Sequence, residues 1–321
     1  MKGATCRSRP APRKTYPARV PIRPLEPTLR DAYARCERIA RERVENFPVL
    51  SEHLAPELIP HFAAVYAFCR IADDAGDESG SPEAATARLD ALERELRAAF
   101  AGSPPTPEMT ALAATAAEKR LPIEPFLALL SAFRQDQTKT RYADWDDLLD
   151  YCTRSANPVG ELVLRLLDEV PSRDDGRKLA KSNAICTGLQ LANFWQDVAR
   201  DWAKGRIYAP LADLERHGVA EDQIARGVCD DRFRTLLASL CDRTDALFAE
   251  GASLADLVAK RHRIPVLAFA LAGQGLLKRI REARYDVFSK RPEISSGQAK
   301  AILARAVAAR WIPALRPKVA P

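Results

Sequence analysis

The chain of 321 residues has little glycine and no long apolar run. Only 14 glycines occur, and the alternation of apolar and polar residues that marks half-buried strands is scarce. No apolar stretch reaches the roughly 18 residues that a membrane-spanning helix needs, and the basic N-terminus has no apolar core of a secretory signal. With abundant Ala and Leu, these absences predict an all-α fold without a spanning helix.

The chain also lacks the common cysteine and histidine patterns of metal and redox sites. Its seven cysteines form no CxxC pair and their number is odd. This favours reduced thiols in a cytoplasmic protein over a disulfide framework or a zinc site. The four histidines form no HxxxH or HExxH pattern, and no GxGxxG fingerprint of a Rossmann dinucleotide site occurs.

Positive charge is concentrated at the N-terminus. Residues 1–30 carry eight Lys or Arg and one acid, whereas the whole chain has a net charge of +6, so the rest has a net charge of −1. The first 28 residues are also rich in proline and aperiodic, which predicts a solvated, disordered tail. The alternative is a weak contact with an anionic membrane surface; no nucleic-acid partner is expected.

Beyond this tail, apolar periodicity predicts one helical domain over residues 29–312, followed by a flexible end at 313–321. Asp144, with Asp147 at the third helical position, is expected to cap a short helix. Helices are expected at residues 25–43, 56–78, 83–100, 107–119, 122–136, 144–152, 155–169, 180–210, 210–227, 231–259, 264–286 and 296–309.

The stretch 180–210 reads as one long helix with a polar stripe on an otherwise apolar surface. The stripe consists of Gln190, Asn193, Asp197 and Asp201, spaced by three, four and four residues, so all four fall on one helical face. Carboxylates one turn apart repel each other. This stripe therefore predicts a cation partner or a metal ion nearby.

A second acidic stripe ends the helix expected at 56–78. Arg70, Asp73 and Asp77 share a face by the same spacing. Carboxylates are disfavoured at a helix C-terminus, which carries partial negative charge, so their presence there needs a reason. Two such stripes predict a cage for hard cations such as Mg²⁺, which prefers carboxylate, water and phosphate oxygens.

The residues around the stripes suit departure of a diphosphate. Arg70, Lys204 and Arg206 can hold the departing oxygens, and an apolar cavity suits a hydrocarbon chain and a carbocation. Aromatic rings can shelter that cation by cation–π attraction, although each can equally be ordinary core. The candidate aromatic residues are Phe47, Tyr66, Tyr151 and Tyr208.

Two long sequence words carry a family resemblance. YAFCRIADDAGDE (66–78) and LQLANFWQDVARDWAKGRIYAP (189–210) resemble the first and second aspartate-rich motifs of the squalene/phytoene synthase family. The resemblance covers about residues 30–310 and implies the isoprenoid synthase fold, with the two motifs facing each other across a central cavity.

The resemblance also implies roles for individual residues. Two or three Mg²⁺ ions with diphosphate would be bound by Asp73, Asp77, Asp197 and Asp201. Substrate would be bound by Phe47, Tyr66, Arg70, Gln190, Lys204 and Arg206. Catalytic roles would fall to Tyr151, Asn193 and Tyr208, and we also predict a catalytic role for Asn157, which the family pattern does not supply.

Within the family, three local words resemble bacterial hydroxysqualene synthases of hopanoid biosynthesis. They are ENFPV (45–49), TKTRYADWDDLLDYC (138–152) and SANPVGE (155–161). This resemblance implies ionisation of presqualene diphosphate and capture by water, without NADPH, near the inner membrane. A different enzyme would supply the substrate from two molecules of farnesyl diphosphate, and a flavin-dependent reductase would consume the product.

Departures from the general family pattern favour this reaction over joining two diphosphates. Glu45-Asn46 replaces a Ser-rich stretch, Gln196 stands where an Arg usually precedes the motif aspartate, and Asn157-Pro158 replaces small apolar residues. Fewer positive donors suit one diphosphate, and Asn157 is predicted either to help hold the attacking water or to pack and cap.

Two alternatives stay open. The first is a squalene or phytoene synthase that condenses two prenyl diphosphates. The second is a non-catalytic assembly protein on the same fold, disfavoured because all four motif aspartates are present.

Overall fold

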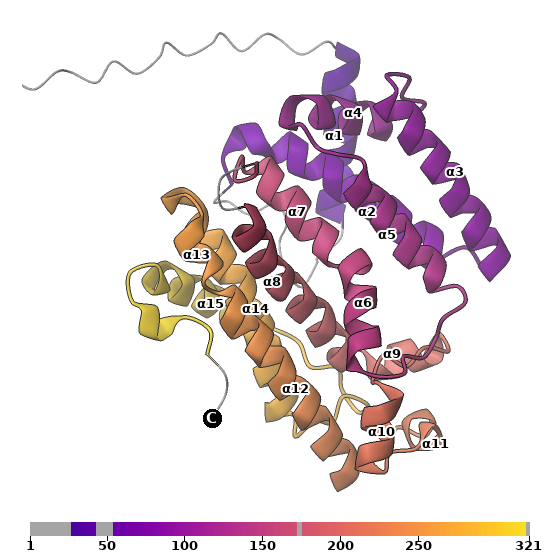
Figure 1. The fold of residues 1–321 in the computed structure, drawn as a ribbon, viewed down its shortest axis with the longest axis vertical. Helices are drawn as coiled ribbons and strands as arrows, with labels where there is room; N and C mark the ends of the chain where they lie inside the picture. Colours follow the sequence, from indigo (N-terminus) through magenta and orange to yellow (C-terminus); the bar gives the residue numbers. More distant parts are fainter. Residues whose placement is uncertain (1–26, 43–53, 172–174, 319–321) are drawn as a thin grey trace, which may run out of the picture.

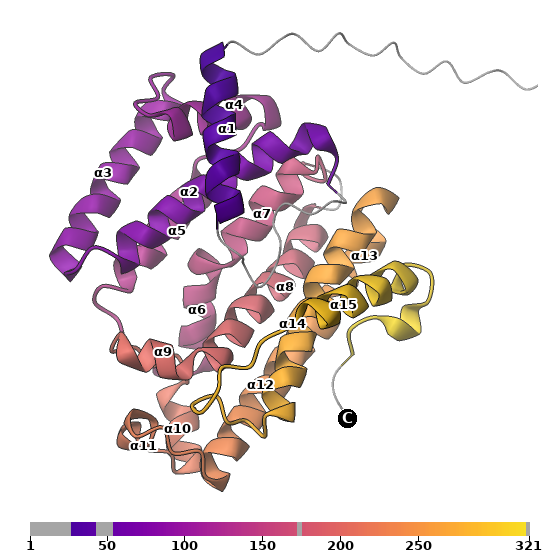
Figure 2. The ribbon, with the colours of Figure 1, turned by 180° about the vertical axis from the view of Figure 1, so that it is seen from behind.

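The computed structural model describes residues 27–42, 54–171 and 175–318, and all the regular elements in these ranges are helices (Figures 1 and 2). The predicted all-α class is confirmed. The tail up to residue 26, the segment 45–49 with Phe47, and residues 319–321 lie outside the described ranges. Within them, no helix is long and apolar enough to cross a membrane.

The helices follow the predicted order. The first half contains α1 (Pro27–Glu42), η1 (Pro56–Leu58), α2 (Ile59–Asp77), α3 (Pro82–Phe100), α4 (Pro107–Lys119), α5 (Glu124–Gln135), α6 (Trp145–Ser155) and α7 (Asn157–Leu166). The second half contains α8 (Asp175–Gln196), α9 (Val198–Ala203), α10 (Leu211–His217), α11 (Glu221–Ala225), α12 (Asp231–Gly251), α13 (Leu254–Leu257), η2 (Lys260–His262), α14 (Arg263–Glu282), α15 (Ser296–Ala309) and η3 (Pro313–Leu315).

Side-chain caps explain several helix starts. The side chain of the residue before the helix accepts a backbone N–H at α3, α4, α6, α12 and α15. The predicted cap of α6 is confirmed, because the Asp144 carboxylate accepts the N–H of Asp147 at 2.9 Å. Such caps satisfy backbone donors that have no partner within the helix.

The prediction of one helix over 180–210 is wrong. Helix α8 ends at Gln196, Asp197 leaves helical geometry (φ −103°, ψ 16°), and α9 ends at Ala203. Both Gln196 and Asp197 are held there by the side chain of Arg291, which lies after α14. A contact from so far along the chain bends the helix without any proline or glycine at the bend, so local sequence does not reveal it.

The end of the expected helix also differs. Gly205 has φ +76°, which closes the turn after α9. Beyond it the Ile207 N–H donates to the carbonyl of Thr140 at 3.0 Å. Residues 207–210 are therefore extended rather than helical, and they run beside the segment that precedes α6.

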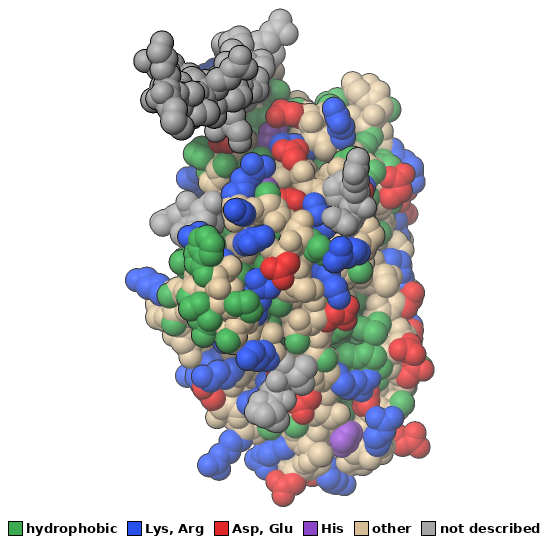
Figure 3. Space-filling model, turned by 60° about the vertical axis from the view of Figure 1, so that its left-hand side comes forward, with side chains coloured by type: hydrophobic (Ala, Val, Ile, Leu, Met, Phe, Trp, Pro, Cys, Tyr) green, Lys and Arg blue, Asp and Glu red, His purple; other side chains and the backbone are tan. Residues whose placement is uncertain are grey.

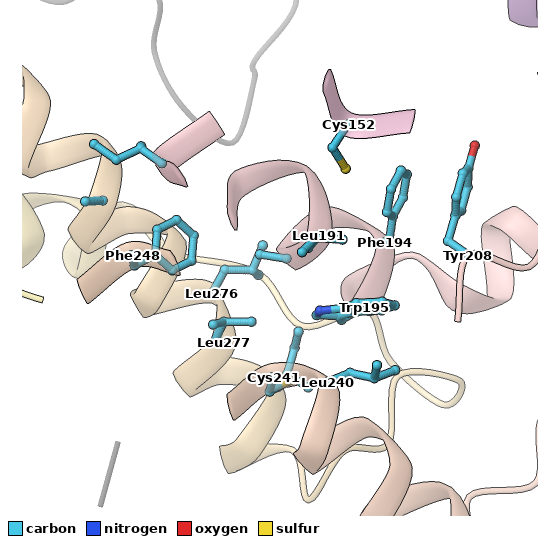
Figure 4. Packing of buried hydrophobic residues seen from close by; sticks show 14 of the residues in the cluster. Cys152, Leu191, Phe194, Trp195, Tyr208, Leu240, Cys241, Phe248, Leu276 and Leu277 are labelled. Atoms are coloured by element: carbon cyan, nitrogen blue, oxygen red, sulfur yellow. The ribbon is translucent and has the colours of Figure 1, made fainter. Parts of the chain in front are cut away.

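The long helices α8, α12 and α14 pack closely in the lower half of the molecule, below α1–α5 (Figures 1 and 2). The ring of Phe248 on α12 fills the space left by two glycines, Gly188 on α8 and Gly273 on α14. Figure 4 shows this ring in the cluster with Leu276 and Leu277 of α14. The packing fixes the position of α8, which carries half of the candidate site.

Gly273→Ala should therefore destabilise the fold. A Cβ atom at residue 273 would lie 2.0 Å from Cζ of Phe248, and we expect the free energy of unfolding to fall by about 2 kcal/mol, as overpacking does elsewhere. Urea unfolding measures this. The matched control is Gly297→Ala in α15, where a Cβ meets no atom within 4 Å; equal stability of the two variants would refute the packing argument.

Candidate active site

The end of α2 and the α8–α9 bend enclose a pocket of about 280 Å³. Both predicted acidic stripes open into it, which confirms that they face a common space. The residues lining the pocket are Asp73, Asp77, Phe133, Asp136, Tyr151, Ser155, Gln190, Asn193, Phe194, Asp197, Asp201, Lys204, Arg206 and Tyr208. A larger pocket of about 470 Å³ between α14 and α15 contains none of the motif residues.

Cationic side chains meet the acids of the first stripe. Arg70 Nη1 lies 2.9 Å from an Asp73 oxygen, as their shared face predicts. Asp77 instead binds across the pocket, to Lys204 Nζ at 2.5 Å and Arg206 Nη1 at 2.9 Å. These last two contacts join the first motif to the second.

Two of the acids have pKa values above their usual range. Burial raises the pKa of Asp73 to about 6, with Arg70 opposing the shift. Burial and the neighbouring Asp197 raise the pKa of Asp201 to about 7. In the described ranges no basic side chain lies within ion-pair distance of Asp201. For Asp77, burial raises the pKa, but Lys204 and Arg206 more than offset this and hold it below its usual value.

Arg141 fixes the turn that presents Lys204 and Arg206. Its Nη1 donates to the carbonyl of Gly205 at 2.7 Å, while Nε and Nη2 bind both oxygens of Glu221 at 2.8 Å. Lys204 and Arg206 thus project from a turn that Arg141 connects to Glu221. They can meet an anionic substrate with little loss of backbone freedom.

The apolar wall of the pocket is aromatic. The rings of Phe194 and Tyr208 stack at 3.6 Å between centroids and 7° between planes, and Figure 4 shows them side by side. Tyr151 lies 6.0 Å from Tyr208, and both hydroxyls are buried with pKa values raised well above the usual range by that burial. The wall offers neutral π-faces suited to a carbocation.

A carboxyl that the sequence analysis missed also lines the pocket. Asp136, directly after α5, is 8% exposed. It accepts a hydrogen bond at 2.7 Å from the Tyr151 hydroxyl. Burial raises its pKa to about 6, against the hydrogen bond from Tyr151 and the charge of Arg206. It lies in the polar segment RQDQ (134–137), where no local signal marks it as buried.

Arg291 is the second missed residue. Its Nε and Nη2 bind the two oxygens of Asp197 at 2.6 and 2.9 Å, and Nη2 also donates to Gln196 Oε1 at 2.7 Å. Gln196, 1% exposed, thus stands beside a guanidinium although the sequence has no Arg there. Arg291 thus places a guanidinium beside Gln196 from a distant loop, while the inference that fewer groups hold the diphosphate stays a prediction.

The remaining predicted residues lie off the pocket lining. Asn157 begins α7, and its Oδ1 accepts a hydrogen bond from Thr187 of α8 at 2.9 Å. This matches the packing alternative, and its role in holding water stays a prediction. Tyr66 and Arg70 are partly buried on α2, where Arg70 forms ion pairs with Asp73 and Asp74, and their roles in binding substrate stay predictions.

The donor set suits Mg²⁺ held jointly with a diphosphate. The motif donors are carboxylates on two helices facing one pocket, and two of them keep raised pKa values. No group of three His, Cys, Asp or Glu side chains in the part of the chain that the structure describes is assembled closely enough to hold an ion alone. Mg²⁺ commonly binds through one or two carboxylates and completes its shell with phosphate oxygens and water, so the residues fit that mode.

Known proteins match this chain over most of its length. Squalene synthase HpnC of Alicyclobacillus acidocaldarius is 44% identical and covers 81% of this chain and 97% of its own, with a TM-score of 0.75. A dehydrosqualene synthase is 25% identical over 87% of this chain and 96% of its own, with a TM-score of 0.79.

Curated relatives are phytoene synthases. The 15-cis-phytoene synthase of Synechocystis sp. is 31% identical over 82% of this chain and 81% of its own length. Phytoene synthase 3, chloroplastic, of Zea mays is 29% identical over 85% of this chain, which spans 65% of that longer relative. Residues 40–298 match the squalene/phytoene synthase family. The chain therefore belongs to the squalene/phytoene synthase family of isoprenoid diphosphate-processing enzymes.

Proposed function

We propose that the protein ionises presqualene diphosphate and directs water to the resulting carbocation, giving hydroxysqualene and diphosphate. The observation that carries the ionisation step is the joint lining of one pocket by both aspartate motifs with Lys204 and Arg206. Bound Mg²⁺ would neutralise charge on the diphosphate. Lys204 and Arg206 hold the departing oxygens by charge-assisted hydrogen bonds, and the stacked Phe194 and Tyr208 rings shelter the cation.

Capture by water is supported by polar groups within the same pocket. Asp136 Oδ1 and Ser155 Oγ are buried and have no hydrogen-bond partner among the residues that the structure describes, although both residues line the pocket. Gln190 and Asn193 add amide groups to that lining. A buried polar group without a hydrogen-bond partner costs free energy. A pocket wall that only shelters a hydrocarbon cation would therefore be expected to lack such polar groups.

Substrate choice tests this proposal. Purified protein with Mg²⁺ and no NADPH is incubated with presqualene diphosphate or with farnesyl diphosphate, and the lipid products are identified by mass spectrometry. The proposal requires a C30 alcohol from presqualene diphosphate and no product from farnesyl diphosphate. A C30 or C40 hydrocarbon, or presqualene diphosphate formed from a shorter substrate, would contradict it.

Condensation of two prenyl diphosphates is the second candidate, and Arg291 favours it. Lys204, Arg206 and Arg291 each form an ion pair with a motif aspartate, so the site has more positive charge for a second diphosphate than the sequence alone indicated. The curated phytoene synthases among the relatives agree with this alternative. The substrate comparison above separates the two candidates.

The proposed reaction places the protein between two others and beside a membrane. An enzyme that forms presqualene diphosphate would supply the substrate, and a flavin-dependent reductase would remove the alcohol. Substrate and product are both very apolar, so we propose peripheral contact with the inner membrane. The end of α15 and the residues that follow it support this contact, because Val307, Trp311 and Ile312 are exposed there. Figure 3 shows one face of the molecule on which hydrophobic side chains lie among Lys and Arg side chains.

Replacing Trp311 and Ile312 by serine should weaken that contact. These side chains are 70% and 50% exposed, Arg310 lies 4.9 Å from the Trp311 ring, and no acid follows Glu293 in the sequence. We expect binding to phosphatidylglycerol vesicles in a co-sedimentation assay to fall at least about fivefold, since each side chain loses apolar burial in the bilayer.

The matched control exposes two apolar residues elsewhere. Leu211 and Val228 are 40% and 39% exposed, so the Leu211→Ser, Val228→Ser variant removes similar side chains from another surface. It should bind vesicles like the unaltered protein. Equal loss of binding in both double variants, or in neither, would contradict contact through α15.

A further inference from the structure

The pocket contains a hydrogen-bonded pair that no motif accounts for. Tyr151 on α6 donates its hydroxyl proton to Asp136 Oδ2 at 2.7 Å. The other carboxylate oxygen, Oδ1, is buried and has no hydrogen-bond partner within the described ranges. The Tyr151 hydroxyl is a donor that is already engaged, and its raised pKa keeps it protonated. Of this pair, only the carboxylate can accept a further proton.

A second unpartnered atom lies in the same pocket. The hydroxyl of Ser155, one turn after Tyr151 on α6, is buried, and in the part of the chain that the structure describes it has no hydrogen-bond partner. Both Ser155 and Asp136 line the pocket. A hydroxyl and a carboxylate oxygen that are both open are suited to hold one water molecule, which donates to the carboxylate and bonds to the hydroxyl.

We propose that Asp136 accepts the proton of the water that traps the carbocation, with Ser155 holding that water and Tyr151 positioning the carboxylate. The inference rests on the proposed function. The C–O bond to diphosphate breaks and its electron pair leaves with the diphosphate. The cyclopropylcarbinyl cation rearranges and a cyclopropane C–C bond opens. The water oxygen then bonds to the resulting cationic carbon, one O–H bond breaks, and that proton moves to Asp136 Oδ1. The products are the alcohol, diphosphate and a neutral Asp136 carboxyl.

The charges around Asp136 agree with a base that works near neutral pH. Its carboxylate form is favoured by Arg206 and by the Tyr151 hydrogen bond, and is disfavoured by burial, Asp73 and Asp77. Two further neutral phenols face it, Tyr142 and Tyr208. With a pKa of about 6, the carboxyl is ionised at pH 7.5 and remains a useful base, since proton acceptors work best with a pKa near the working pH.

Product partition tests the assignment, because it separates water capture from ionisation. The ratio of alcohol formed to diphosphate released is measured with presqualene diphosphate and Mg²⁺. Asp136→Asn keeps an acceptor for Tyr151 but places an amide where Oδ1 was. We expect the ratio to fall at least about tenfold, the lower range of proton-transfer effects, while diphosphate is still released.

The pH profile distinguishes the roles of the three residues. In the unaltered protein the ratio should fall below pH 6 as Asp136 becomes protonated. Tyr151→Phe removes a bond to the ionised form, so the midpoint should move to higher pH. Ser155→Ala should lower the ratio and leave the midpoint in place, whereas Asp136→Asn should show no midpoint.

A buried carboxylate remote from the pocket supplies the control. Asp245, 2% exposed, binds Arg281 and Gln274 between α12 and α14. Asp245→Asn should leave the ratio per diphosphate unchanged even if less protein folds. If the unaltered protein forms the alcohol and folded Asp136→Asn shows the same ratio, the assignment of the base to Asp136 is overturned, whereas the proposed function still stands. An unaltered protein that forms no alcohol would overturn the inference together with the proposed function.

Discussion

Asp73→Asn combined with Asp197→Asn should abolish turnover of the diphosphate, lowering kcat/KM by at least about 10³-fold. The two carboxylates belong to opposite motifs and line the same pocket. Losing both removes one anionic ligand from each side of the site, so charge that develops on the departing diphosphate is no longer neutralised. Because both side chains are replaced by amides of the same shape, the fold should be retained.

Steady-state kinetics measure this loss, and a surface pair supplies the control. Asp90 and Asp242 each bind an arginine, Arg134 and Arg281, outside the pocket. The Asp90→Asn, Asp242→Asn variant should keep most of its activity, since exposed ion pairs contribute little. Function retained in the pocket double variant would instead revive the non-catalytic assembly hypothesis.

Arg291→Met should lower kcat/KM by about 10²-fold, comparable to removal of one electrostatic donor from an active site. Asp197 would lose its bidentate ion pair with the Arg291 guanidinium, at 2.6 and 2.9 Å. Gln196 Oε1 would lose the hydrogen bond from Arg291. Asp197 and Asp201 would then repel each other with less compensation, and the bend between α8 and α9 would lose the contact that holds it.

Two further variants separate charge from geometry at this position. Arg291→Lys keeps the positive charge but loses the planar guanidinium that binds both oxygens of Asp197. We therefore expect its kcat/KM to lie between that of Arg291→Met and that of the unaltered protein. Lys290→Met, an exposed neighbour, should leave kcat/KM unchanged. If Arg291→Met were as active as the unaltered protein, Arg291 would only bind the loop to the helix end and would have no part in the reaction.

Local sequence predicted most of the helices and the pairing of the two motifs. Capping side chains such as Asp144, and the apolar period of each helix, are local signals that survive in the fold. The spacing of Asp73 with Asp77, and of Asp197 with Asp201, was enough to place each pair on one face. That both faces open into one pocket followed from the cost of isolated acids.

What the sequence could not reveal depends on contacts between distant segments. The bend at Asp197 is held by Arg291, 94 residues along the chain. Asp136 is buried and is bound by Tyr151, which lies 15 residues further along the chain. Gln196 looked like the loss of a cation, but a guanidinium reaches it from elsewhere. In each case the sequence around the residue contains no signal of the distant residue that contacts it.

The origin of the product oxygen tests the central claim most directly. Presqualene diphosphate is turned over with Mg²⁺ in water enriched in ¹⁸O, and the label is located by mass spectrometry. Ionisation followed by water capture predicts one ¹⁸O in the alcohol and none in the released diphosphate, because the C–O bond breaks. Label in the diphosphate, or a hydrocarbon product without oxygen, would contradict the account.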